Sequence, residues 1–201
     1  LSILLTLAYI VINPPITILM MQRPSKVERQ WVDLEEISPN MIQAVVASED
    51  NLFLSHNGFD FEQIKIAAKE AKRKNKAMRG ASTISQQTAK NVFLWNGRSY
   101  LRKGLEVWHT FLIETFWSKE RIMEVYLNVI EYGDGIYGIE AASQHYFNRS
   151  AKKLSKRQSA LIAAALPSPL KRNPAYPTKY LNRRANKIMR LMNNIGPVKF
   201  E

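Results

Sequence analysis

The chain has 201 residues, of which 46% are hydrophobic and 10% aromatic, the composition of a globular protein with a sizeable core. Its formal net charge of +12 attracts polyanions such as nucleic acid, anionic lipid headgroups or phosphorylated substrates. The sequence contains no cysteine, which excludes disulfides, thiolate metal sites and cysteine nucleophiles.

The first 21 residues, LSILLTLAYIVINPPITILMM, carry no charged side chain. As a helix, kinked at Pro14-Pro15, they would be roughly 30 Å long, about the thickness of the hydrocarbon core of a bilayer. The apolar part of a signal peptide is the alternative, but no small-residue cleavage site follows. We therefore predict a transmembrane anchor over residues 1–22 and a single globular domain over residues 23–201.

Beyond the anchor the sequence predicts helix after helix. Ser38 before Pro39 is a helix start, and Asp60 with Gln63 and Ser155 with Gln158 have capping-box spacing. A basic amphipathic helix closes the chain. One further helix carries an apolar stripe made of Leu101, Leu105, Trp108, Phe111, Leu112 and Phe116. No run alternates convincingly as a strand, so the predicted fold class is all-α.

Two adjacent acids, Glu49 and Asp50, stand at the end of the helix that starts at Ser38. Acids are disfavoured at this end of the helix dipole, and most such pairs are solvated turn residues. Here Phe53 and His56 follow at short spacing, which indicates a compact polar and aromatic turn after a buried helix. The pair is therefore a candidate for chemistry.

Two further stretches group polar side chains. The first, RGASTISQQTAKN, contains Ser82, Thr83, Gln86, Gln87, Lys90 and Asn91, which could cap a helix or hold the oxygens of a sugar or diphosphate. The second, RKGLE, places Arg102 and Lys103 on one helical face with Glu106. This second group could be a surface ion-pair ladder or a cation cluster for a diphosphate. His56, His109 and His145 are too scattered to indicate a metal site, so none is assigned.

Taken together, these stretches resemble the peptidoglycan glycosyltransferases, glycosyltransferase family 51. The matching segments occur in family order as EDNLFLSHNGFD, GASTISQQTAKN, RKGLE with LIETFWSKERIMEVYLN, GIYGIEAASQHYF and LIAAALPSPLKRNP. Ser85 stands where the family often has Thr, a change that keeps the hydroxyl. The resemblance covers roughly residues 36–175, and five ordered motifs are far more specific than any one of them.

The resemblance implies a lysozyme-like α-helical fold, with a large globular lobe and a smaller membrane-facing jaw lobe. Residues 61–80 and 92–95 are the candidates for that jaw. It also implies the monofunctional branch of the family, without a transpeptidase domain. The domain would lie on the outer face of the bacterial cytoplasmic membrane, held by a single-pass anchor, although the basic residues after the anchor, taken alone, favour the cytoplasmic side.

The implied reaction polymerises lipid II into linear glycan strands. The GlcNAc 4-hydroxyl of lipid II attacks the anomeric carbon of the undecaprenyl-diphosphate-linked chain, with inversion to a β-1,4 bond. Glu49 matches the family's general base, and Lys90, Arg102 and Lys103 match cations that stabilise the leaving diphosphate. Glu106 matches a second essential acid, which would orient the cations, hold a divalent metal or assist protonation.

Other implied features concern substrate binding and partners. Asp50, Phe53, His56, Thr83 and Gln87 would shape the site and bind substrate. Mg²⁺ or Mn²⁺ would come with the substrate diphosphate, and a phosphate mimic such as moenomycin would bind at the cations. The expected partners are lipid II, the growing strand, the membrane and proteins of cell-wall synthesis or division, with no nucleic acid. Glu49 and Glu106 should line one cleft, with their carboxyls at or beyond the ~6.5–9.5 Å of inverting glycosidases.

Two other classes of protein compete with this interpretation. A membrane-tethered basic protein that binds lipid or nucleic acid explains the charge but not the combined acids, amides and cations. A lysozyme-like hydrolase would need a donor acid but no diphosphate cluster, so Lys90, Arg102 and Lys103 disfavour it.

Overall fold

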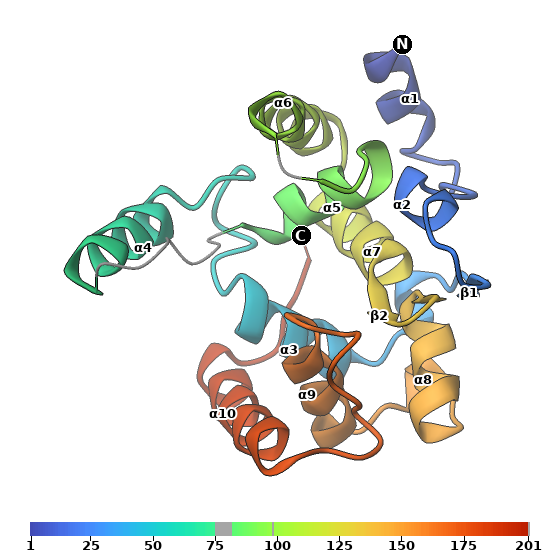
Figure 1. Ribbon diagram of the computed structural model, residues 1–201, viewed down its shortest axis with the longest axis vertical. Coiled ribbons are helices and arrows are strands. Elements are labelled where there is room, and N and C mark those ends of the chain that lie inside the picture. The colour runs from blue at the N-terminus through green and yellow to red at the C-terminus, as the bar shows by residue number, and fades with distance from the viewer. Residues whose placement is uncertain (75–81, 98, 201) are drawn as a thin grey trace.

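The computed structural model describes residues 1–74, 82–97 and 99–200, and they form a mostly helical molecule (Figure 1). The helices are α1 (Ser2–Ala8), α2 (Ile18–Met21), α3 (Pro39–Glu49), α4 (Phe61–Lys74), α5 (Ile84–Phe93), α6 (Tyr100–Phe116), α7 (Lys119–Val129), α8 (Ile139–Phe147), α9 (Lys156–Ala165) and α10 (Lys179–Ile195), with short 3-10 turns η1 (Leu34–Glu36) and η2 (Ala151–Lys153). The predicted helical class is confirmed.

A small sheet accompanies the helices and was not predicted. It consists of β1 (Glu28–Arg29), β2 (Glu131–Gly133) and β3 (Ile136–Tyr137) in the order β1-β3-β2, with β1 parallel and β2 antiparallel to β3. Strands of two or three residues are too short to show an alternating pattern, so hydrophobic periodicity cannot predict them. The sheet joins the segment before α3 to the connection between α7 and α8.

Side-chain caps fix the helix starts that position the site. The Ser38 hydroxyl accepts from the backbone N–H of Asn40, and Asp60 Oδ1 accepts from that of Gln63 at 2.8 Å. Thr83 and Gln86 form a complete capping box at the start of α5, as Ser155 and Gln158 do at α9. Each cap typically contributes about 0.5–2 kcal/mol, and all the predicted starts are confirmed.

Two apolar clusters hold the helices together. In the larger one α5 packs against α6 and α7, with Phe53, Ile84 and Met123 fully buried. The smaller one joins α3, α9 and α10, which lie side by side in Figure 1. Its buried alanines, such as Ala44 and Ala164, have almost no side-chain volume, so these three helices can approach closely.

The N-terminal segment does not form the single kinked helix predicted for residues 1–21. It contains two short helices, α1 and α2, separated by a stretch that includes Pro14 and Pro15. Proline lacks a backbone donor, and Arg29 Nη1 binds the carbonyls of Pro14 and Pro15 at 2.7 and 2.8 Å, so the helix is interrupted there. None of the helices that the structure describes is long and apolar enough to cross a bilayer.

The apolar stripe predicted on α6 does form, but most of it faces outward. Leu101 is 70% exposed, Phe111 55% and Trp108 43%. An apolar helix stripe ordinarily faces the core. The buried face of α6 instead carries Glu106, His109, Thr110, Leu112 and Ile113. A helix with a polar buried face and an apolar exposed face indicates a site on one side and an apolar partner on the other.

The predicted jaw agrees with the structure in part of its range. Helix α4 projects away from the other helices in Figure 1, with Phe61 and Ile66 exposed, whereas residues 75–81 lie outside the described part. The other candidate, residues 92–95, is wrong: Val92, Phe93 and Leu94 are buried in the core, because the end of α5 packs against α2.

Candidate active site

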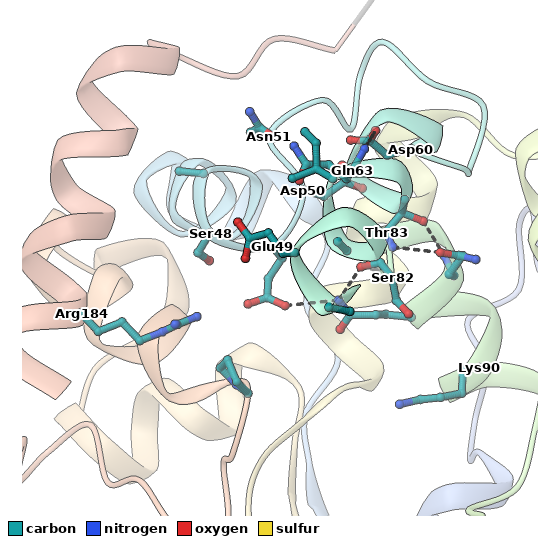
Figure 2. A pocket seen from close by; sticks show the side chains of 18 of the residues that line it. Ser48, Glu49, Asp50, Asn51, Asp60, Gln63, Ser82, Thr83, Lys90 and Arg184 are labelled. Carbon is teal, nitrogen blue, oxygen red and sulfur yellow. Dashed lines mark hydrogen bonds between the residues drawn. The ribbon is translucent and has the colours of Figure 1, made fainter. Parts of the chain in front are cut away.

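A cavity of about 1150 Å³ opens between α3, α4, α5, α6 and α10 (Figure 2). It is larger than the roughly 300–1,000 Å³ of ordinary small-molecule sites, so it suits an extended substrate. Most of its lining residues are polar or charged. The polar and charged lining residues include Ser48, Glu49, Asp50, Asn51, Asp60, Gln63, Glu70, Ser82, Thr83, Gln86, Gln87, Lys90, Glu106, Arg172, Tyr180 and Arg184.

Glu49, the last residue of α3, lies in this wall. Its Oε2 accepts a hydrogen bond from Gln87 Nε2 at 3.2 Å. Burial raises the pKa of Glu49, and the hydrogen bond from Gln87 and the charge of Arg184 counteract only part of that rise. A carboxylate with a raised pKa is a stronger proton acceptor, which suits a general base.

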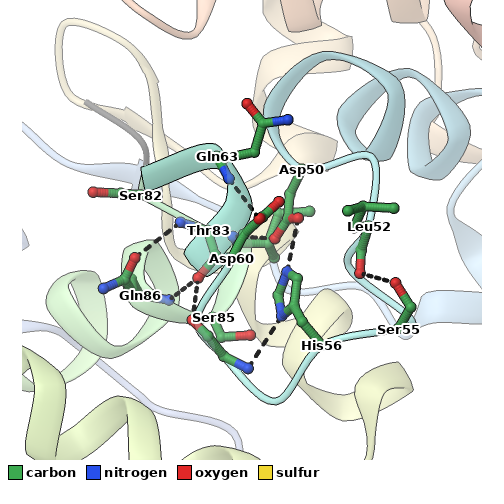
Figure 3. Close-up of polar contacts among 12 residues, drawn as sticks. Asp50, Leu52, Ser55, His56, Asp60, Gln63, Ser82, Thr83, Ser85 and Gln86 are labelled. Atoms are coloured by element: carbon green, nitrogen blue, oxygen red, sulfur yellow. Dashed lines mark hydrogen bonds and ion pairs between the residues drawn. The ribbon is translucent and has the colours of Figure 1, made fainter. Parts of the chain in front are cut away.

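Asp50, by contrast, is occupied by structural hydrogen bonds (Figure 3). Its Oδ2 accepts from the backbone N–H of Ile84 at 2.9 Å, and its Oδ1 lies 2.9 Å from His56 Nε2. The N–H of Gly58 donates to His56 Nδ1, so Nε2 carries the proton and donates to Asp50. Asp50 therefore ties the loop after Glu49 to the start of α5.

The loop after Glu49 also depends on Gly58. Gly58 has a φ of +83°, and a Cβ there would lie 2.8 Å from Thr110 Cγ2 and 2.9 Å from Glu114 Cγ. Its carbonyl accepts from the Thr83 hydroxyl at 2.7 Å. Only glycine allows both this backbone conformation and this close approach to α6.

Lys90 of α5 and Glu106 of α6 line the same cavity as Glu49. Burial lowers the pKa of Lys90, and the Glu106 carboxylate opposes that change. Glu106 accepts from Arg102 Nη1 at 3.1 Å and from Lys103 Nζ at 2.5 Å, and its side chain is only 5% exposed. The expectation that Glu49 and Glu106 share a cleft therefore agrees with the structure.

Arg102 and Lys103 do not themselves line the cavity as the structure describes it, although their partner Glu106 does. RKGLE is therefore an ion-pair cluster beside the cavity, and its role toward a diphosphate stays a prediction. The close pairing with two cations makes Glu106 a poor metal ligand. Within residues 1–74, 82–97 and 99–200, no group of three His, Asp or Glu residues could hold a metal ion.

The other predicted residues divide between the wall and its support. Ser82, Thr83, Gln86 and Gln87 line the cavity. Support comes from three residues outside the wall: Phe53 is fully buried, the amide of Asn91 donates to the carbonyl of Gln87 at 2.7 Å, and His56 holds Asp50.

Arg184 is a wall residue that the sequence reasoning missed. It comes from α10, and Figure 2 shows Arg184 and Lys90 on opposite sides of Glu49. Its Nε is buried and has no hydrogen-bond partner in the part of the chain that the structure describes. The sequence signal was the basic run NRRANK, but only the packing of α10 on α3 brings Arg184 next to Glu49.

Lys119 and Glu114, also missed, support the site from behind. Lys119 Nζ donates to Glu114 Oε1 at 2.9 Å and to the carbonyl of His56 at 2.6 Å. It also lies 4.7 Å from the centre of the Phe53 ring, and Ser85 donates to Glu114. These contacts fix the loop after Glu49 against α5 and α6.

A partly buried carboxylate with cations on either side of it in a large cavity is the arrangement of a group-transfer enzyme for an anionic substrate. The transglycosylase family model matches residues 17–193, so the chain belongs to the transglycosylase family. It is 61% identical over 163 residues to the biosynthetic peptidoglycan transglycosylase of Bacteroides thetaiotaomicron, covering 81% of this chain and 65% of that protein.

Two more relatives carry the same name. The protein of Caulobacter vibrioides is 55% identical over 183 residues, covering 90% of this chain and 80% of the relative. That of Pseudomonas fluorescens SBW25 is 48% identical over 204 residues, covering 97% and 85%. The resemblance drawn from the five motifs is therefore confirmed.

Proposed function

We propose that this chain polymerises lipid II into peptidoglycan glycan strands by inverting glycosyl transfer, releasing undecaprenyl diphosphate. The single observation that carries the proposal is that Glu49, Lys90 and Glu106 line one cavity, within a member of the transglycosylase family. An inverting displacement needs a base on one face of the sugar and stabilisation of the leaving group on the other.

The reaction follows from this placement. Glu49 takes the proton of the GlcNAc 4-hydroxyl while the oxygen of that hydroxyl attacks the anomeric carbon of the donor strand. The bond from that carbon to the diphosphate breaks, and negative charge grows on the leaving oxygens. Lys90 faces this charge, and Glu106 holds Arg102 and Lys103 beside it. A phosphate mimic such as moenomycin is expected to compete at this group.

In the same reaction, Arg184 is proposed to bind the diphosphate of the acceptor, lipid II. Lipid II has its own diphosphate, at the opposite end of the disaccharide from the 4-hydroxyl that reacts. Arg184 lies on the far side of Glu49 from Lys90, where that second diphosphate would extend. A guanidinium suits phosphate oxygens, because its N–H groups can bind them in pairs, and the buried Nε of Arg184 has no other partner among the described residues.

The exposed apolar stripe of α6 supports a membrane location. Helix α1 packs on α6, and its side chains Leu4, Leu5 and Leu7 are also exposed. Together with the net positive charge, this face suits the anionic outer leaflet of the cytoplasmic membrane, where lipid II is embedded. We retain residues 1–22 as the membrane-attachment segment, with residues 23–201 as the catalytic domain.

Further parts of the proposal concern cofactors and other activities. The described residues offer no protein-based metal site, so Mg²⁺ or Mn²⁺ would accompany the substrate diphosphate. We propose no peptide cross-linking activity for this chain, whose sequence contains no Lys-Thr-Gly motif. Cell-wall synthesis or division proteins are the proposed protein partners.

The test is incubation of the purified protein with lipid II in detergent or vesicles, followed by separation of polymer from monomer. Polymer is expected with the wild type, and Glu49→Gln should be slower by about 10²–10⁴-fold, because an amide cannot accept the proton. Lipid II binding should persist in this variant. Cleavage of preformed glycan without polymer would support a hydrolase instead, and near wild-type turnover by Glu49→Gln would remove the assigned base.

A further inference from the structure

The Gln87 side chain connects Glu49 to a buried tyrosine. Its Nε2 donates to Glu49 Oε2 at 3.2 Å and lies 3.4 Å from the carbonyl of Ser82, while its Oε1 accepts from the Tyr126 hydroxyl at 3.4 Å. Tyr126 belongs to α7 and is 1% exposed. A chain of hydrogen bonds thus runs from the core of the molecule to the base.

The three partners together define the orientation of the amide. Glu49 and the carbonyl of Ser82 are both acceptors, so they require the NH₂ group of Gln87. Burial raises the pKa of Tyr126 well above its ordinary value, with the charge of Glu49 acting in the same direction. The phenol therefore keeps its proton and can donate it to Gln87 Oε1.

We propose that Tyr126 is a positioning residue for the proposed glycosyl transfer: its hydroxyl holds the Gln87 oxygen and so keeps the Gln87 NH₂ group on the Glu49 carboxylate. Without that hydroxyl, Gln87 Oε1 loses the hydrogen bond that Tyr126 donates. The Gln87 amide can then rotate and place its oxygen next to the Glu49 carboxylate, and the two oxygen acceptors repel each other. The negative charge on Glu49 is then less stabilised, and its pKa rises further.

Other charges also act on Glu49 and would be unchanged by this substitution. Asp50 is adjacent in sequence, and Arg184 faces Glu49 from α10. The other ionisable groups of the cavity wall that the structure describes are Asp60 before α4, Glu70 of α4, Lys90 of α5, Glu106 of α6, Arg172 before α10 and Tyr180 of α10. None of them belongs to α7, so a change confined to Tyr126 reports on the Gln87 contact.

The chain offers a matched control. Tyr132 is also buried, at 2% exposed, and its hydroxyl donates to the carbonyl of Leu127 at 3.2 Å. Tyr132→Phe removes a buried phenolic hydroxyl just as Tyr126→Phe does, but leaves the contact between Tyr126 and Gln87 intact. A general effect of losing a core hydroxyl should appear equally in both variants.

The experiment is a ¹³C NMR titration of glutamate-labelled protein, with the Glu49 signal identified by its absence in Glu49→Gln. Tyr126→Phe should move the Glu49 midpoint upward by roughly one pH unit, the scale of losing a hydrogen bond to a charged group. Tyr132→Phe should leave it in place. The acid limb of kcat/KM for lipid II polymerisation should move with the titration.

The coupling is tested in a Gln87→Ala background, where Tyr126→Phe should produce no additional shift. An unchanged midpoint in folded Tyr126→Phe, an equal shift in Tyr132→Phe, or a further shift without Gln87 would each overturn the proposal. The titration measures the pKa of Glu49 without turnover, so its result does not depend on whether the protein polymerises lipid II. A wild type that makes no polymer would refute the proposed activity while the Glu49 titration still decides the role of Tyr126.

Discussion

At the scale of single residues, Glu49 shows how a reactive group lowers stability. Its pKa is raised by burial, so the folded protein holds its proton more tightly than the unfolded chain does. Stability associated with such an acid falls as the pH rises through the unfolded and then the folded pKa. The ionised base is therefore a destabilising element at neutral pH.

Glu49→Gln should consequently be more stable than the wild type at pH 7.5, although it should polymerise lipid II more slowly. The gain should shrink at pH 5, where more of the wild-type Glu49 is protonated. Urea unfolding at the two pH values measures this, with Glu62→Gln, an exposed substitution on α4, as the control. A variant that is less stable at pH 7.5 would show that the carboxylate is held favourably.

For His109, burial makes stability change with pH in the opposite direction to Glu49. His109 is buried on α6, stacked on Phe93 with ring centroids 4.4 Å apart, and its Nδ1 lacks a partner among the residues that the structure describes. Burial lowers the pKa of His109, so the unfolded chain binds its proton more readily. The corresponding stability is present above the unfolded pKa of about 6.5 and is lost as the pH falls below it.

We expect His109 to lower the free energy of unfolding between pH 7.5 and pH 5.5, opposite in sign to the effect of Glu49, and His109→Gln to remove this fall. His145→Gln is the control, because His145 is exposed on α8. Denaturant unfolding of the three proteins at both pH values gives the comparison. If His145→Gln reduces the fall as much as His109→Gln does, burial of His109 is not the cause.

At the scale of elements, α6 combines two functions in one helix. Its buried face supplies Glu106 to the cavity, while Trp108 and Phe111 remain exposed on the opposite side. These two aromatic residues, at positions i and i+3, form an exposed apolar patch together with the exposed leucines of α1. In the proposed function this face contacts lipid.

Replacing Trp108 and Phe111 together by Gln should weaken binding to vesicles that contain anionic lipid by at least several-fold, because the apolar contact with the acyl region is lost. Cosedimentation with vesicles measures the effect. A matched double variant on another exposed surface, Tyr176→Gln with Leu170→Gln, should bind as the wild type does. Equal losses in both variants would show that the α6 face has no special role.

At the scale of the whole molecule, the N-terminal segment is packed onto the rest of the structure. Trp117 Nε1 donates to the carbonyl of Thr6 at 2.8 Å, and Arg121 donates to that of Tyr9 at 3.1 Å. Met20 is 2% exposed within the larger core cluster. A proposed attachment segment held in this way would fix the orientation of the cavity relative to the membrane.

Removing residues 1–22 should leave a helical, active domain, because every cavity residue lies beyond residue 46. The truncated domain should nevertheless unfold at a lower denaturant concentration and bind vesicles more weakly. Circular dichroism, urea titration and cosedimentation test the three statements. A truncated chain that is unfolded would place the domain boundary before residue 22.

The sequence by itself determined the helices beyond the N-terminal segment, and the chemical groups of the site. Helix starts at Ser38, Thr83 and Ser118 follow from local hydrogen bonds between a side chain and the next turn, so neighbouring residues contain the information. The five motifs likewise indicated Glu49 and Glu106 as acids that act together, and the structure brings both to one cavity.

Only the tertiary structure decided which side chains surround those acids. Arg184 reaches Glu49 from α10, and Tyr126 reaches Gln87 from α7, through contacts between residues 135 and 39 positions apart in sequence. The same applies to the outward-facing stripe of α6, whose periodicity marks an apolar face but not its direction. Local patterns fix the conformation of a segment, whereas its neighbours depend on how all the segments pack.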